Sequence, residues 1–364
     1  MQIKDVTNYL EKLAPLSYAE DFDNVGLLVG NYNTEVTGVL VTLDTLEKTV
    51  DEAIEKNCNL IISFHPIIFS GLKRLNGNNY VERVVLKAIQ NNIAIYAIHT
   101  ALDNVKQGVS GKMCEVLGLQ NPKTLIPKKG TIKKLTTYVP NNNAEKLRNK
   151  LFEAGAGNIG NYDNCSFNTT GIGSFKGSDD SNPSLGKKGE QVFAEETCIT
   201  VTYDSFREST ILKTLFNNHP YEEVAYEIIT LNNKNQNIGM GMIGELPKEL
   251  NEKEFLNFIK ETFKTDCIRH SELLQKSIKK VAVLGGSGSF AINAAIKANA
   301  DAYISADFKY HEFFKAEKKI LLLDVGHYES EQFTKNLLVD YLNKKISTFA
   351  IILSEESTNP IYYI

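Results

Sequence analysis

Four short apolar runs that each lead into a histidine constrain the fold of this chain most. Residues 59–64 lead to His65, residues 93–98 to His99, residues 302–306 to His311, and residues 320–325 to His327. The chain has only six histidines, and scattered core or surface histidines would not repeat this position. Such runs are typical of buried parallel strands, whose carboxyl ends are where ligands gather in α/β proteins. We therefore expect the four segments to meet at one crevice.

The residue types at these positions favour a metal site. His327 and Glu331 are four residues apart, so both side chains lie on one face if a helix begins there. An imidazole and a carboxylate held together suit a divalent metal ion. A glutamate placed by the helix dipole beside a surface histidine would explain this pair alone. It does not explain the repetition, which predicts a metal site at the strand ends.

The composition narrows the class of protein. The chain has 364 residues, 42% hydrophobic and 23% charged residues and a net charge of −4, without a basic stripe for nucleic acid. Its five cysteines form no C-x-x-C pair, which argues against a thiolate zinc site and against a disulfide framework. No apolar run approaches the ~20 residues of a membrane span, and the N-terminus does not read as a signal sequence. We expect a cytoplasmic protein without membrane or general nucleic-acid partners.

The periodicity predicts a discontinuous α/β core with lobes at residues 1–128 and 238–364. Strands and helices alternate with spacings that imply parallel strands and right-handed crossovers. In the first lobe we expect helices at 3–13, 46–56, 80–90 and 108–117, the last capped by Ser110, and strands at 26–29, 38–44, 59–64 and 92–98. In the second we expect helices at 251–263 and 291–298 and a strand from residue 280 that enters a glycine turn.

Residues 129–237 follow another pattern. Strands at 134–139, 165–174, 196–203 and 224–230 and helices at 144–154 and 206–216 give the order βαββαβ, the ferredoxin-like α+β plan. Residues 176–190 are polar and indicate a loop. Residues 217–223 are densely polar. A turn into the last strand explains them better than a second active site does. We expect this insertion to decorate an edge of the core.

The glycine turn at residues 285–289 leaves two interpretations open. Gly286, Ser287 and Gly288 could present backbone N–H groups and a hydroxyl to a phosphate at a helix start. The turn is neither a dinucleotide fingerprint nor a Walker A loop, because no lysine follows the last glycine. Tight-turn geometry alone explains it equally well.

Several segments together resemble the NIF-three-like proteins, often labelled GTP cyclohydrolase I type 2 homologues. The matching segments are residues 19–30, 63–69, 99–103, 241–246, 307–311 and 326–331. They span both halves of the core. The insertion looks like that of the longer bacterial members, which is similar to PII and CutA proteins. The resemblance implies a NIF-three-like core with its metal site at the carboxyl ends of strands and an inserted PII/CutA-like domain.

The resemblance also implies a dinuclear metal site. Its ligands are a His-His-Pro motif, an aspartate, and a late histidine and glutamate, which match His65, Asp103, His327 and Glu331 here. The first histidine of the motif is Phe64 in this chain. We expect one firmly held divalent ion and a partial second site, while His99, His311 or water filling the gap is the alternative. Zn, Fe, Mn or Co would suit these ligands, at one or two ions per chain.

Two functions follow from this resemblance. The first is a metal-dependent hydrolase that acts on a nucleotide or related phosphorylated compound through a metal-activated water, with GTP ring opening as the named candidate. His99, Lys309 and His311 are then candidates for proton transfer or for holding an anion. The second is a non-catalytic metal-binding or regulatory protein, which Phe64 favours. The resemblance implies a homo-oligomer, a hexamer, and a nucleotide or other small-molecule ligand.

Overall fold

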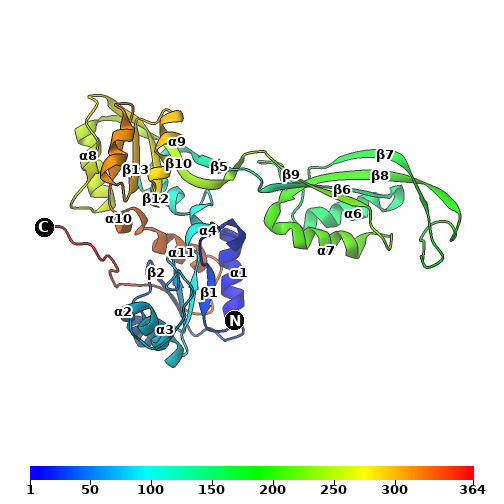
Figure 1. Cartoon of the computed structure of the whole chain (residues 1–364), viewed down its shortest axis with the longest axis horizontal. Coiled ribbons are helices and arrows are strands. Elements are labelled where there is room, and N and C mark those ends of the chain that lie inside the picture. Colours follow the sequence, from blue (N-terminus) through cyan, green and yellow to red (C-terminus); the bar gives the residue numbers. More distant parts are fainter. The chain divides into compact units, whose positions relative to one another are not determined.

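The computed structural model describes residues 1–364, and contacts within the chain divide it into two compact units. The first contains Met1–Pro127 and Gln236–Ile364, and the second contains Lys128–Asn235. Figure 1 labels many of the elements of both units. No helix is both long enough and apolar enough to cross a membrane.

The first unit holds two β-sheets. The first sheet has the strand order β1-β4-β3-β2-β15, in which only β1 is antiparallel to its neighbour. Its strands are β1 (Gly26–Val29), β2 (Val39–Thr42), β3 (Leu60–Ser63), β4 (Ala94–Ala97) and β15 (Ile351–Leu353). The helices of this part of the chain are α1 (Ile3–Leu13), η1 (Leu16–Tyr18), α2 (Glu47–Glu55), α3 (Tyr80–Gln90) and α4 (His99–Asp103). Every residue of β2, β3 and β4 is buried, as parallel strands covered on both faces require.

The second sheet has the order β11-β14-β13-β12-β10-β5. Its strands are β5 (Gln120–Lys128), β10 (Asn235–Asn251), β11 (Arg269–His270), β12 (Ser277–Ser287), β13 (Ala302–Ala306) and β14 (Leu321–Asp324). The accompanying helices are α5 (Val109–Val116), α8 (Glu252–Phe263), η3 (Ser289–Ala291), α9 (Ile292–Lys297), η4 (Tyr310–Ala316), α10 (His327–Glu331) and α11 (Thr334–Asn343). Val283 packs in one core cluster with Phe255 of α8, whereas Leu284 packs in another with Ile292 of α9. Successive strand residues point to opposite faces, so the sheet is buried on both sides.

Each sheet contains one strand from the other half of the sequence. β15 pairs in parallel with β2, and β5 lies beside β10 at the edge of the second sheet. Sequence patterns predicted neither strand, because β15 has only three residues and β5 contains Pro122 and Pro127. Proline is tolerated in edge strands, where one side of the backbone needs no partner. Backbone pairing therefore links the two halves of the core.

The second unit has the element order that its sequence predicts. Its elements are β6 (Ile132–Pro140), α6 (Asn141–Glu153), β7 (Phe167–Lys176), β8 (Gln191–Asp204), η2 (Ser205–Arg207), α7 (Glu208–Asn218) and β9 (Tyr226–Leu231). The strands form an antiparallel sheet in the order β7-β8-β6-β9. Leu147 of α6 and Ile211 of α7 share a core cluster with Leu135 and Ile199 of the sheet. Figure 1 shows both helices on the same face of this sheet.

One local prediction is wrong. Ser110 does not cap α5: it is buried inside the helix, and the residue that precedes the first turn is Gly108. A Cβ at Gly108 would lie 1.8 Å from the Leu102 carbonyl oxygen, so that position requires glycine. Close packing against α4, rather than side-chain capping, therefore sets the start of this helix.

Candidate metal centre

Two histidines from different sheets meet at the carboxyl ends of the strands. His65 follows β3 of the first sheet, and His327 begins α10, directly after β14 of the second. Their Nε2 atoms are 3.4 Å apart. Glu331, one helical turn after His327, places Oε2 at 3.1 Å from His65 Nε2 and 3.2 Å from His327 Nε2. The structure thus brings together three of the four residues expected to bind metal.

Two aspartates fix the orientation of the imidazoles. Asp44, which follows β2, lies 2.8 Å from His65 Nδ1, and Asp307, which follows β13, lies 2.7 Å from His327 Nδ1. A carboxylate can only accept a hydrogen bond, so each Nδ1 carries the proton that is donated to it. A neutral ring then keeps its lone pair on Nε2. Thr358 donates a hydrogen bond of 2.6 Å to the second oxygen of Asp44. Both Nε2 atoms are therefore directed at Glu331.

Glu331 itself carries an unsatisfied atom. Its side chain is 4% exposed, and its buried Oε2 accepts no hydrogen bond of good geometry, although two Nε2 atoms lie 3.1 and 3.2 Å away. A buried carboxylate oxygen whose hydrogen bonds are poorly formed is costly, and native structures seldom leave one. Two imidazole nitrogens and a carboxylate oxygen converging on one point form a donor set that fits a divalent transition metal.

The three side chains change one another's pKa values. Burial lowers the pKa of His65 and of His327, but hydrogen bonds and charges from Asp44, Asp307 and Glu331 outweigh it and raise these pKa values to about 10 and about 11. Burial raises the pKa of Glu331, but the two imidazoles outweigh it and lower that pKa to about 2. A cation entering at Nε2 must therefore displace protons from the imidazoles.

The glycine turn makes room for Glu331. A Cβ at Gly286 would lie 2.3 Å from Glu331 Oε1, and Gly286 has a φ of +66°. The expected phosphate donors are already engaged: Gly286 N–H donates to Ser330 Oγ at 2.9 Å and Gly288 N–H to the Ala306 carbonyl at 3.4 Å. The Ser287 hydroxyl donates to Asp307. These contacts agree with the tight-turn interpretation and leave none of these donors free for a phosphate.

Asp103 lies beside the group of three without joining it. It ends α4 and lines a cavity of about 290 Å³ together with His99, His327 and Glu331. Burial, with a further contribution from the charge of Glu331, raises the pKa of Asp103 well above its usual range. This carboxyl therefore holds a proton more readily than an exposed aspartate does.

His99 is held by a residue that sequence patterns did not single out. Asp23 lies 2.8 Å from His99 Nδ1 and accepts a bond of 3.0 Å from the Thr100 N–H. Burial raises the pKa of Asp23, but the bonds from His99 and Thr100 outweigh it and lower that pKa to about 2. The ring of His99 lies 5.2 Å from that of His65, on the wall of the cavity.

Phe64, Lys309 and His311, which the sequence also singled out, place no side-chain donor atom in the cavity. Phe64 is fully buried, with its ring 4.9 Å from His65 and 5.5 Å from His99, so this position offers no ligand atom. Lys309 and His311 are exposed at η4 and do not line the cavity. His311 packs instead against the ring of Tyr310, 5.1 Å away.

Three exposed phenylalanines also line the cavity. Phe22, Phe69 and Phe290 are 65%, 52% and 57% exposed. The rings of Phe22 and Phe69 are 6.3 Å apart, and Phe69 lies 6.4 Å from His99. Exposed apolar side chains that gather at a polar site are typical of a ligand-binding rim.

Comparisons with known proteins agree with this architecture. The family model Duf34/NIF3 (NGG1p interacting factor 3) matches residues 1–360. The chain is 36% identical, over 99% of its length and 98% of the relative, to the "GTP cyclohydrolase 1 type 2 homolog" of Bacillus subtilis (strain 168). The solved structure of a Bacillus cereus protein related to NIF3 matches with a TM-score of 0.88 and 34% identity, covering 100% of this chain and 99% of that one. The chain therefore belongs to the Duf34/NIF3 family.

Proposed function

We propose that this chain binds a divalent metal ion through His65, His327 and Glu331 and uses it to hydrolyse a nucleotide or related phosphorylated compound. The observation that carries the proposal is the convergence of the two Nε2 atoms on the buried Oε2 of Glu331, which makes no hydrogen bond of good geometry with either of them. A bound divalent ion would supply a Lewis acid and lower the pKa of a coordinated water.

The residues around this group have roles that fit hydrolysis. Asp103, with its raised pKa, can hold and deliver a proton from the cavity wall. His99 can accept a proton at Nε2 while Asp23 fixes its ring through Nδ1. The exposed ring of Phe22 can pack against a planar base, and the name of the Bacillus subtilis relative makes GTP the first substrate to test.

The burial of Phe64 favours one firmly held ion. A second ion could use only groups that lie beside the first site, such as Asp103 and the Nε2 of His99, and would bind more weakly. The same observation supports the second candidate function, a metal-binding protein that does not catalyse a reaction. Phe64 and the location of His311 outside the cavity both reduce the number of groups available for catalysis.

Substrate turnover separates the two functions. Protein supplied in turn with Zn²⁺, Mn²⁺, Co²⁺ or Fe²⁺ is assayed with GTP and other nucleotides, for phosphate release and for changes in the absorbance of the base. We expect turnover that His327→Ala abolishes and His270→Ala preserves, because His270 is exposed outside the cavity. Bound metal without turnover would support the non-catalytic function, and turnover that survives His327→Ala would refute the assigned site.

The second unit adds a proposal about architecture. Its βαββαβ order and its strand order support the inserted PII/CutA-like domain that the sequence led us to expect.

We also propose that the chain assembles with copies of itself. Light scattering on the purified protein at several concentrations tests this assembly, and a mass of one chain throughout would contradict it.

A further inference from the structure

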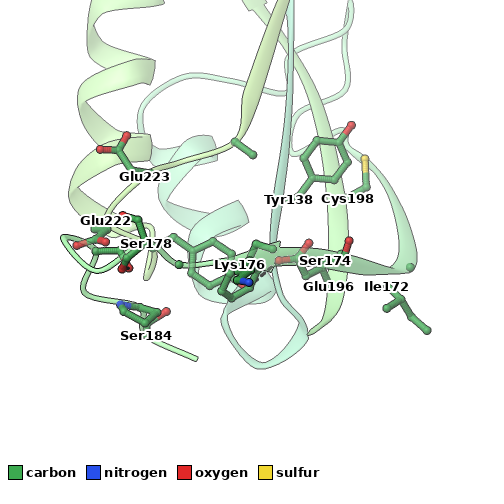
Figure 2. A pocket seen from close by; sticks show the side chains of 18 of the residues that line it. Tyr138, Ile172, Ser174, Lys176, Ser178, Ser184, Glu196, Cys198, Glu222 and Glu223 are labelled. Carbon is green, nitrogen blue, oxygen red and sulfur yellow. Dashed lines mark hydrogen bonds between the residues drawn. The ribbon is translucent and has the colours of Figure 1, made fainter. Parts of the chain in front are cut away.

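A second cavity, of about 730 Å³, lies within the unit of residues 128–235 and shares no lining residue with the metal centre. Strands β7 and β8, the loop at residues 177–184 and the segment at residues 221–225 contribute its walls. Figure 2 shows the side chains around it. The backbone N–H of Asn182 donates to Glu222 Oε1 at 2.7 Å and ties the loop to the opposite segment.

A nearly buried carboxylate lines this cavity. Glu196 is 9% exposed, and its Oε1 accepts a hydrogen bond of 2.7 Å from the hydroxyl of Tyr221. Its Oε2 accepts no hydrogen bond. This oxygen lies beside Gly173 of the neighbouring strand, where a Cβ would come within 2.1 Å of it. The glycine thus provides the space for a carboxylate oxygen that is available to a ligand.

The polar patch at residues 217–223 holds this arrangement in place. His219 donates from Nε2 to the Tyr138 carbonyl at 2.9 Å, and its Nδ1 accepts from the Tyr221 N–H at 3.1 Å. These two contacts require the neutral ring with its proton on Nε2. Burial lowers the pKa of His219, which favours the same neutral form. His219 therefore positions Tyr221, and Tyr221 positions Glu196.

The charges and rings around Glu196 indicate the kind of ligand. Glu222 and Glu223 also line the cavity, against a single lysine, Lys176, so the lining is net negative. The ring of Phe175 lies 5.8 Å from that of Tyr221. A desolvated carboxylate beside aromatic faces stabilises a cation through charge-assisted hydrogen bonds and cation–π contacts.

We propose that this cavity binds a small organic cation, a protonated amine on an apolar body. The amine donates to Oε2 of Glu196, and the apolar body packs against the adjoining rings of Phe175 and Tyr221. A neutral molecule of the same shape would leave this carboxylate oxygen without a charged partner and would bind more weakly.

Binding of phenethylamine to the full-length chain, measured by NMR titration, tests the proposal. Its uncharged analogue 2-phenylethanol is the matched ligand control. The matched protein pair is Glu196→Gln and Glu195→Gln, since Glu195 is the next residue on β8 but is exposed outside the cavity. We expect the amine to bind wild type and Glu195→Gln equally, Glu196→Gln at least tenfold more weakly, and the alcohol to bind wild type at least tenfold more weakly than the amine.

A second variant tests the same oxygen in case Glu196→Gln does not fold. Gly173→Ala places a methyl group against Oε2 and should cause the same loss while Glu196 keeps its charge. Circular dichroism and thermal melting establish that each variant is folded. Equal binding of the amine and the alcohol, equal binding by wild type and the folded Glu196→Gln or Gly173→Ala variant, or no binding of the amine to wild type would each overturn the proposal.

Discussion

Replacing Gly286 by alanine should damage the metal centre without adding or removing a charge. Gly286 has a φ of +66°, and alanine in this left-handed region costs about 1–2 kcal/mol. The new Cβ would also lie 2.3 Å from Glu331 Oε1, so the carboxylate must rotate. Rotation withdraws Oε2 from the two Nε2 atoms that lie 3.1 and 3.2 Å away. We expect metal affinity to fall at least tenfold, about 1.4 kcal/mol.

Gly118→Ala is the matched control. Gly118 has nearly the same φ, +64°, but its added Cβ would meet nothing within 4 Å. Both variants should therefore lose about 1–2 kcal/mol of unfolding free energy from the backbone alone. Isothermal titration with Zn²⁺ or Mn²⁺, combined with chemical denaturation, separates this loss from the effect on the site. If Gly286→Ala binds metal as tightly as Gly118→Ala, the glycine turn does not position Glu331 as a ligand.

Three further predictions follow from the site. Asp44→Asn and Asp307→Asn should each lower metal affinity about 10–100-fold, because each aspartate orients a histidine; titration calorimetry measures this, and unchanged affinity would show that the aspartates have no such role. Metal at about 100 times its Kd should stabilise wild type by about 2.7 kcal/mol in thermal or chemical unfolding, and His327→Ala should lose this gain. The folded pKa of Asp23 is lowered from 3.8 to about 2, so its stabilisation is present above about pH 4 and is lost as the pH falls towards 2. The unfolding free energies of wild type and Asp23→Asn should converge over this range, and a constant difference would contradict the assigned pKa.

Sequence patterns could locate the residues whose structure is set by their neighbours along the chain. Continuous apolar runs identified β3, β4, β13 and β14, and the residues just after β3 and β14, His65 and His327, do meet. Strand direction explains why each histidine lies at the carboxyl edge of its own sheet. β3 and β14 belong to different sheets, so the meeting of the two histidines also depends on how these sheets pack, which strand patterns do not predict.

Other features depend on contacts that a single sequence does not reveal. Asp44 and Asp307 both directly follow apolar runs, which was a usable signal, but an aspartate after a strand equally indicates a turn. The glycine turn could not be separated from a phosphate loop, because its donors are taken by Ser330 and Ala306 from distant segments. His311 shares a strand end with Asp307, yet η4 carries it to an exposed position outside the cavity.

The metal content of purified protein, measured by elemental analysis after metal loading and dialysis, tests the central claim most directly. Wild type should retain one divalent ion per chain, because His65, His327 and Glu331 supply one complete group of donors and Phe64 supplies none. Folded Glu331→Ala and His327→Ala should retain none. A wild-type protein that retains no ion after loading, or folded variants that retain it as wild type does, would contradict the account of this site.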